Sequence, residues 1–394
     1  MRILICSTDP PVEPLEGTGL VLRALLDRLG DRHEIRVVAL AGHADPAAAG
    51  PAVRIVTAPP GSRAADVRLL AAWLVTGAPL RAGDVTRALA GAVREEVASF
   101  APDVVHVTPG QLGGLHRELG ATPRVMVPLD AWHVAALARA DDATGLRRRL
   151  LLAEARRRRR FELREYRHYA AVVVVSDLDA RALHDARRPL AIEVIPNGVA
   201  AERFARRADA PPRDPARLIF HGNMAHSPNE VAAVHLAREV LPRVRRDVPD
   251  ATLALVGRAP TDRVRALADE PGVIVTGAVP DVRDELDRAG VYTCAMQTGS
   301  GIKNKVLEAM ANGLPVVGTP LAFGGVTFRD GEEALLADGP DAFAAAVTGL
   351  IRDPARAAEI ARRGREHVAA RHTWDTVAAA YERLYERAAA TSSG

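Results

Sequence analysis

The chain has 394 residues, a length that indicates two domains and allows a sizeable core without disulfides. Apolar residues make up 48% and charged residues 26%, which excludes a disordered or fibrous chain. The net charge is only +3 and aromatic residues are 4%, so composition does not indicate a nucleic-acid-binding protein. Of the 52 basic residues only two are lysines, Lys303 and Lys305, and they lie two positions apart.

The two cysteines, Cys6 and Cys294, lie in apolar runs typical of strands, so we expect buried, reduced thiols. No spacing of Cys and His indicates zinc, and no metal or cofactor is expected. The apolar run after Met1 is too short for a signal peptide, and no apolar stretch approaches the roughly 20 residues of a membrane span. These features predict a soluble, cytoplasmic protein.

In the first half, short β-branched runs alternate with helical patterns, which is typical of a parallel sheet covered on both faces. Strands are expected at 3–6, 35–40, 53–56, 104–107, 125–127, 172–175 and 192–195, and helices at 20–29, 64–75, 85–99 and 147–169. This alternation of strand and helix patterns stops at residues 195–199, and the Pro/Arg/Asp-rich tract 206–217 that follows is typical of a hinge.

The second half repeats this alternation. Strands are expected at 218–221, 252–256, 273–276, 291–295, 315–317 and 335–337. One helix has a predicted capping box, with Ser227 as N-cap, Pro228 at the first helical position and Glu230 completing the box. A final helix at 375–389 carries one apolar face. The fold class is therefore α/β, with two doubly wound, Rossmann-like domains that present ligand sites at the carboxyl ends of their strands, facing an interdomain cleft.

The densest candidate site is the segment 297–313, which leaves a strand through a glycine-rich turn and enters a helix. Gly299 and Gly301 allow close backbone approach, and an anion in the turn would gain the helix dipole and two ammonium groups. Glu308, further along the helix, suits neutral hydroxyls better than phosphate. The combination fits a nucleoside diphosphate with its ribose, while the alternative is an ordinary glycine loop and a solvated helix end.

Residues 305–317, which read K-V-L-E-A-M-A-x-G-x-P-V-V, resemble the donor-site signature of the family 4 retaining glycosyltransferases, which have the GT-B fold. Other motifs of that family are similar, in order and spacing, to segments 195–199, 221–229, 255–258 and 275–282. The resemblance covers essentially the whole chain and is strongest over 170–325.

The resemblance implies that Glu308 binds ribose hydroxyls. It implies that Gly301, Ile302 and Lys303 meet the diphosphate or the donor sugar. Backbone near Val279 would meet the base. Gly222, with Asn223 after it, would line the cleft.

Two positions depart from the family pattern. Ser300 stands where the family often has a glutamate, and the usual Arg and Lys phosphate pair is absent after Gly222. A branch of the family with a Gly-x-Gly donor loop is nearer. Phosphate neutralisation would then fall to Lys303, Lys305 or Arg258.

In the first half, Gly17, Thr18 and Gly19 follow a strand and begin a helix, where the family has a loop that approaches the donor phosphate or the acceptor. Asp130 and His133 follow another strand, where the family commonly places a histidine near the transferring sugar. Either could orient a donor hydroxyl or take the acceptor's proton. The alternatives are a helix N-cap for Asp130 and a structural role for His133, as for His106.

Two further segments favour structural interpretations. The arginine-rich helix Arg147–Arg160 could lie on an anionic membrane, but its apolar residues form no wide stripe, so a solvated helix is favoured. The run Asp177-Leu178-Asp179 is similar to a metal-binding Asp-x-Asp, yet it follows Ser176 at a strand end, so helix capping is favoured.

The sequence thus predicts a retaining glycosyltransferase of the hexosyltransferase type, with residues 1–196 and the helix 375–390 as acceptor domain and 197–374 as donor domain. It would move a sugar from a UDP- or dTDP-linked donor to a natural product or an envelope glycoconjugate. The nucleotide sugar is a co-substrate, and no nucleic acid partner is expected. A GT-B nucleotide-sugar epimerase and a non-catalytic nucleotide-sugar-binding protein stay open as alternatives.

Overall fold

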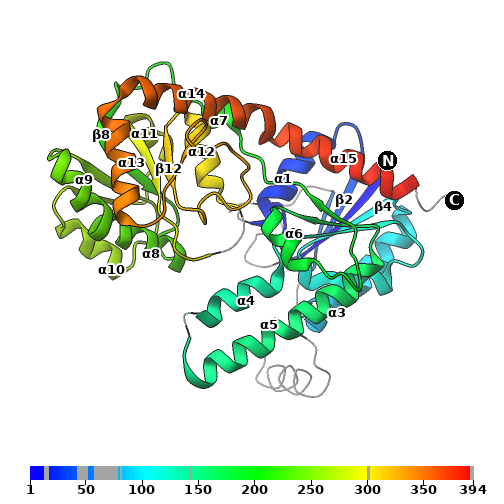
Figure 1. Ribbon diagram of the computed structural model, residues 1–394. Coiled ribbons are helices and arrows are strands. Elements are labelled where there is room, and N and C mark those ends of the chain that lie inside the picture. The colour runs from blue at the N-terminus through cyan, green and yellow to red at the C-terminus, as the bar shows by residue number, and fades with distance from the viewer. Residues whose placement is uncertain are drawn as a thin grey trace. The chain divides into compact units, whose positions relative to one another are not determined.

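The structure is a computed structural model that describes residues 1–12, 17–41, 52–56, 79, 82–141, 143–299 and 302–390. The chain divides into two compact units, which we call unit 1 (Met1–Pro196 with Val377–Gly394) and unit 2 (Asn197–Thr376). Each unit contains one parallel β-sheet packed by helices (Figure 1).

Unit 1 has a seven-stranded sheet in the order β3-β2-β1-β4-β5-β6-β7. Its elements are β1 (Arg2–Ser7), α1 (Thr18–Leu29), β2 (Glu34–Leu40), β3 (Val53–Val56), α3 (Ala82–Phe100), β4 (Val104–Val107), the 3-10 helix η2 (Gly110–Glu118), β5 (Arg124–Leu129), α4 (Trp132–Asp141), α5 (Gly145–Glu165), the 3-10 helix η3 (Tyr166–His168), β6 (Ala171–Val174), α6 (Asp177–Leu183) and β7 (Ile192–Val194).

Unit 2 has a six-stranded sheet in the order β10-β9-β8-β11-β12-β13. Its elements are α7 (Ala201–Phe204), β8 (Asp214–His221), α8 (Ser227–His235), the π-helix η4 (Leu236–Val240), α9 (Leu241–Asp247), β9 (Thr252–Val256), α10 (Asp262–Arg265), the 3-10 helix η5 (Ala266–Asp269), β10 (Val273–Gly277), α11 (Val282–Arg288), β11 (Ala289–Cys294), α12 (Asn304–Asn312), β12 (Val316–Gly318), β13 (Leu335–Leu336), α13 (Pro340–Arg352), α14 (Pro354–Arg371) and the start of α15 (Trp374–Ala390).

The central strands form because they can be buried on both faces. Residues 3–6 of β1 and 104–107 of β4 are buried throughout, as expected for parallel strands covered by helices. All the strands predicted from the sequence are present, with ends that differ by a few residues at most. Both cysteines are buried and free, as predicted. The helix predicted at 64–75 lies outside the described residues.

The capping box predicted at the start of α8 is wrong. The N-cap of α8 is His226, and no side-chain hydrogen bond from the described residues caps this end. The His226 carbonyl instead accepts from the amides of Asn229 and Glu230, so the first turn closes without Ser227. The Glu230 carboxylate is paired with Arg263 at 3.2 Å, so it is not available to bond back to the N-cap.

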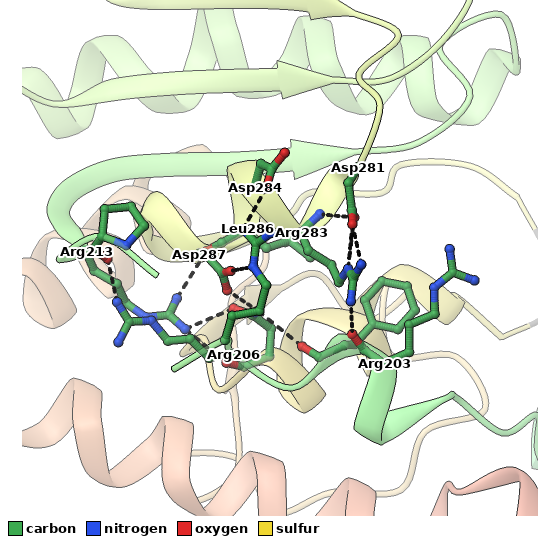
Figure 2. A network of polar contacts seen from close by, with 12 residues as sticks. Arg203, Arg206, Arg213, Asp281, Arg283, Asp284, Leu286 and Asp287 are labelled. Atoms are coloured by element: carbon green, nitrogen blue, oxygen red, sulfur yellow. Dashed lines mark hydrogen bonds and ion pairs between the residues drawn. The ribbon is translucent and has the colours of Figure 1, made fainter. Parts of the chain in front are cut away.

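The tract 206–217 is not a hinge, because it belongs to unit 2 and is bonded to α11 and α12. Arg207 pairs with Asp284 and Asp287 at 2.6 and 2.9 Å. Arg213 donates to backbone carbonyl oxygens at the ends of α11 and α12, and Figure 2 shows it in one polar network with Asp287. Since those carbonyls lack helical partners, the guanidinium caps both helices.

The last helix, α15, begins in unit 2 and continues into unit 1. The apolar face expected from the sequence is buried: Val377, Tyr381, Leu384 and Tyr385 are all at most 3% exposed. Glu382 of this helix pairs with His33 at 2.7 Å, which ties the C-terminal segment to the rest of unit 1.

Each sheet has one point at which the strand order reverses. In unit 1 it lies between β1 and β4, and in unit 2 between β8 and β11. The loops that leave the carboxyl ends of two such strands diverge to opposite faces and leave a crevice, which is where open α/β sheets bind ligands. The topology therefore predicts that ligands bind at the loops after β1, β4, β8 and β11.

Candidate functional site

In unit 2, the loops after β8 and β9 are held against each other. The amide of Gly222 donates to Val256, and that of Met224 donates to Arg258, at 3.0 and 2.9 Å. A Cβ at Gly257 would lie 1.8 Å from the Gly222 carbonyl oxygen, so only glycine allows this approach. Asn223 lies in this loop, and its carbonyl accepts from the Asn229 side chain at 2.8 Å.

Lys305 lies beneath the loop after β8. Its Nζ donates to Asn229 Oδ1 at 2.5 Å and sits 4.7 Å from the centre of the Phe220 ring. A Cβ at Gly222 would lie 2.7 Å from this Nζ. Burial lowers the pKa of Lys305, so its ammonium is held where water solvates it poorly.

Lys303 precedes α12 as its N-cap residue and is only 8% exposed. Together with burial, the charges of Lys305 and Lys303 lower the pKa of His226. Two ammonium groups, with the imidazole of His226 near them, thus lie at the N-terminus of α12, the positive end of the helix dipole. Such a cluster is an electrostatic site for an anion.

The turn before α12 is described only in part. Gly299 has a φ of +107°, which favours glycine, whereas Ser300 and Gly301 lie outside the described residues. Ile302 packs against the core of unit 2. The predicted Gly-x-Gly donor loop therefore stays a prediction.

Glu308 lies on α12, and its Oε2 is 2.7 Å from His221 Nε2. Sequence reasoning missed His221 as a site residue. The signal for it is its position, since it is the last residue of β8, beside the point of strand reversal.

Arg258 and Val279 lie at the same edge of the sheet. Arg258 is exposed after β9, and the next residue, Ala259, has a left-handed φ of +52°. Val279 follows β10 and packs against the core. The predicted site residues of unit 2 that are described thus share the carboxyl edge of one sheet.

In unit 1, Gly17 is the N-cap of α1, which follows β1, and its φ of +50° favours glycine. Thr18 and Gly19 are buried in the first turn of α1. These residues lie at the carboxyl end of β1, beside the reversal between β1 and β4.

The segment that carries Asp130 and His133 follows β5. Leu129 has a left-handed φ of +66°, a conformation that costs about 1–2 kcal/mol in a residue with a side chain. Strain of this kind concentrates at functional sites. Asp130 comes directly after it, and His133 lies in the first turn of α4.

Two buried carboxylates hold this segment: Glu162, which the sequence analysis missed, and Asp179, which it interpreted only as part of a helix cap. Glu162 of α5 accepts from the Trp132 amide and bonds His133 Nδ1, both at 2.6 Å. Asp179 of α6 accepts from the Ala131 amide at 2.9 Å. No local pattern marks Glu162, because it lies 29 positions from His133 within an arginine-rich helix.

The structural interpretations of two other segments agree with the structure. His106 is buried, and its Nδ1 lies 2.7 Å from the hydroxyl of Tyr385. Ser176 caps α6 by accepting from the Asp179 amide, as predicted for the Asp177-Leu178-Asp179 run. Within the described ranges, no group of three or more His, Cys, Asp and Glu side chains could hold a metal ion.

Two Rossmann-like units, each with its candidate ligand-binding residues at the carboxyl edge of a parallel sheet, define a GT-B protein. The Glycosyltransferase Family 4 profile matches residues 15–203, and the profile described as Glycosyl transferases group 1 matches residues 215–353. The chain belongs to glycosyltransferase family 4.

Among curated proteins, the chain is similar to a phosphatidyl-myo-inositol mannosyltransferase of Mycobacterium tuberculosis (strain ATCC 25618 / H37Rv). They are 35% identical over 235 residues, 56% of this chain and 60% of that protein. A GDP-mannose-dependent alpha-(1-6)-phosphatidylinositol monomannoside mannosyltransferase of Mycolicibacterium smegmatis is 31% identical over 211 residues, 47% of this chain and 54% of that one. The chain thus matches between half and two thirds of the length of these relatives.

Among solved structures, sucrose-phosphate synthase from Thermosynechococcus elongatus superposes with a TM-score of 0.73 at 18% identity, covering 99% of both chains. HepE from Anabaena in complex with UDP gives 0.68 at 15% identity, covering 98% of this chain and all of that one. These similarities establish the GT-B fold. None of the helices in the described ranges is long and apolar enough to cross a membrane.

Proposed function

We propose that this protein transfers a glycosyl group from a nucleoside diphosphate sugar to an acceptor hydroxyl, with retention of anomeric configuration. The observation that carries the proposal is the placement of Lys303 and Lys305 at the N-terminus of α12, with the Glu308 carboxylate further along the same helix. Phosphate oxygens accept hydrogen bonds from ammonium groups and helix amides, and ribose hydroxyls donate to a carboxylate. The lysines and Glu308 together therefore fit a nucleotide.

In this proposal the diphosphate is the leaving group, and its charge grows as the glycosidic bond breaks. The Lys303 ammonium and the first amides of α12 are already oriented before the reaction, so they stabilise that charge at little reorganisation cost. The acceptor oxygen then bonds to the anomeric carbon on the face that the diphosphate left, and its proton passes to a base, for which His133 is the candidate.

In unit 1, we propose that Asp130 and His133 contact the donor sugar or the acceptor. Glu162 bonds His133 Nδ1, which fixes the orientation of the ring and, in the neutral tautomer, places the proton on Nδ1. Nε2 then carries the lone pair, which is the arrangement of a general base or of a hydrogen-bond acceptor for a sugar hydroxyl.

The donor base and the acceptor belong to the same proposal. The sequence favours UDP or dTDP, the names of two relatives specify GDP-mannose, and solved neighbours carry UDP. We propose an envelope glycoconjugate as acceptor, since the similar mannosyltransferases are named for phosphatidylinositol lipids. A thermal-shift panel of UDP, dTDP and GDP identifies the base as the nucleotide that raises the unfolding temperature most.

The Lys303→Ala variant tests the phosphate site. Loss of one charged contact to phosphate should weaken binding of the best nucleotide by about tenfold or more, measured by calorimetry. The corresponding nucleoside, which has no phosphate, should bind both proteins equally. Unchanged nucleotide binding would remove Lys303 from the proposed site.

A turnover assay separates this proposal from the two alternatives. Incubation with the nucleotide sugar should yield a free sugar or a glycoside together with the nucleoside diphosphate. An isomeric nucleotide sugar would instead identify an epimerase, and binding without any turnover would identify a non-catalytic binding protein.

A further inference from the structure

His221, the last residue of β8, is fixed against the Glu308 carboxylate. Its Nε2 lies 2.7 Å from Glu308 Oε2, and the residue is only 7% exposed. The imidazole meets the buried ring of Tyr292 edge to face, with centroids 5.4 Å apart and an interplanar angle of 68°. Neighbours on two sides therefore define the orientation of this ring.

The hydrogen-bond pattern also defines where the proton of His221 lies. A carboxylate only accepts hydrogen bonds, so Nε2 must donate to Glu308. Nδ1 is buried and has no hydrogen-bond partner among the described residues. A proton on Nδ1 would be a buried donor without an acceptor, so the tautomer that fits these contacts carries its proton on Nε2.

The hydrogen bond from His221 occupies Oε2 of the Glu308 carboxylate. The glutamate side chain has three rotatable bonds, and ordering such a side chain costs binding free energy. The bond from His221 orders it before any ligand arrives. Oε1 then remains to accept from a neighbouring hydroxyl pair.

We propose that His221 is a positioning residue that holds Glu308 in the rotamer which accepts hydrogen bonds from the ribose hydroxyls of the nucleotide. The inference rests on the proposed function, because it needs a nucleotide on unit 2. Its content is separate, since Glu308 could bind ribose without any help from His221.

The test measures how much the ribose hydroxyls contribute to binding. Dissociation constants are determined by calorimetry for UDP and GDP and for their 2′,3′-dideoxy forms, and the ratio of dideoxy to ribose form is the quantity compared. In Glu308→Ala this ratio should fall to about one, because the hydroxyls then contribute nothing to binding. His221→Leu should lower it by about three- to tenfold through weaker binding of the ribose form, while binding of the dideoxy form stays the same.

The conservative variant separates positioning from mere structural support. A glutamine at position 221 reaches about as far as imidazole Nε2 and can still donate, so His221→Gln should recover most of the ratio that His221→Leu loses. His235→Gln, on α8 of the same unit, is the matched control and should leave the ratio unchanged. Ribose contacts form equally in the bound donor and in the transition state, so His221→Leu should raise KM for the donor with little change in kcat.

The outcomes distinguish this inference from the proposed function. A ratio lost in Glu308→Ala but intact in His221→Leu would overturn the role of His221 and leave the nucleotide site standing. A ratio unchanged in Glu308→Ala, or no nucleotide binding at all, would overturn the proposed site and the inference with it. A drop in binding of both the ribose and the dideoxy form in His221→Leu, not recovered by His221→Gln, would identify His221 as purely structural.

Discussion

At the scale of single residues, the most informative feature is the contrast between fifty arginines and only two lysines, which lie two positions apart. Lys305 Nζ occupies a confined space. It lies 2.5 Å from Asn229 Oδ1, and a Cβ at Gly222 would come within 2.7 Å of it. A compact ammonium fits there, whereas a planar guanidinium needs more room and more acceptors. The packing thus supplies a reason for lysine at this position that coding bias does not.

Substitution of Lys305 tests this explanation. Lys305→Arg should lower both the unfolding temperature and the affinity for nucleotide, because the larger head group displaces the loop after β8. Lys305→Met keeps the volume and removes the charge, so it should weaken nucleotide binding with a smaller loss of stability. Arg238→Lys on the exposed side of the same unit should change neither property. Equal stability of Lys305→Arg and the unchanged protein would show that space does not select lysine.

The buried His106 predicts how stability depends on pH. Burial lowers its pKa to about 3, from an ordinary value of 6.5. Between these values the unfolded chain binds a proton that the folded chain does not, so stability falls as the pH falls. The free energy of unfolding should decrease by about 1.4 kcal/mol per pH unit in this window on account of this residue.

Urea denaturation at pH 7, 6 and 5, followed by circular dichroism, measures that slope. His106→Asn cannot titrate but keeps a polar partner for the Tyr385 hydroxyl, so its slope should be smaller by the contribution of one proton. His33, which is paired with Glu382, is a suitable control, and His33→Asn should leave the contribution of His106 in place. Identical slopes for His106→Asn and the unchanged protein would contradict the assignment.

At the scale of elements, α4 depends on side chains from other helices for its N-terminus. Glu162 of α5 and Asp179 of α6 accept from the amides of Trp132 and Ala131, groups that the helix itself leaves without partners. Both carboxylates are buried. The segment after β5 that holds Asp130 and His133 is therefore positioned by tertiary contacts.

Asp179 and Asp177 form a matched pair for testing this. The Asp179 carboxylate accepts from two donors, the Ala131 amide and the Ser176 hydroxyl. Asp179→Asn replaces one acceptor oxygen with a donor, so it should lower the free energy of unfolding by about 1–3 kcal/mol. Asp177→Asn changes an exposed residue in the first turn of α6, where the carboxylate favours the helix dipole, and should cost less than about 1 kcal/mol. Urea denaturation of both variants measures the difference, and equal losses would argue against the buried role of Asp179.

The strands could be predicted from the sequence because a strand buried on both faces leaves a continuous β-branched signal, as in residues 104–107. Helix ends were less predictable. The predicted box at Ser227 and Glu230 failed because the side chain of Glu230 has a distant partner, Arg263. The tract 206–217 has the composition of a hinge, yet arginines bonded to α11 and α12 hold it in unit 2.

At the scale of the whole molecule, the two units have separate hydrophobic cores, one around β1 and β4 and one around β8 and β11. The residues on which the proposed nucleotide site rests, Lys303, Lys305 and Glu308, all belong to unit 2. A unit with its own core and its own site should keep both when it is separated.

The fragment Asn197–Thr376 tests this separation. Expressed alone, it should unfold cooperatively and bind the nucleotide with an affinity close to that of the full chain, but it should show no transfer, because Asp130 and His133 are absent. The same fragment with Lys303→Ala is the control and should lose the binding. A folded fragment that fails to bind nucleotide would show that unit 1 contributes to the affinity.

Burial periodicity and ordered motifs are properties of neighbouring positions, so the two sheets, the family and the stretch of chain that carries the lysines and Glu308 could be predicted from the amino-acid sequence. The contacts between distant groups become visible only in the folded chain: His221 with Glu308, Asn229 with Lys305, and Glu162 with His133. These pairs are separated by 87, 76 and 29 positions. Hydrogen bonds of this kind depend on how helices pack onto a sheet, and no local pattern of residues encodes that packing.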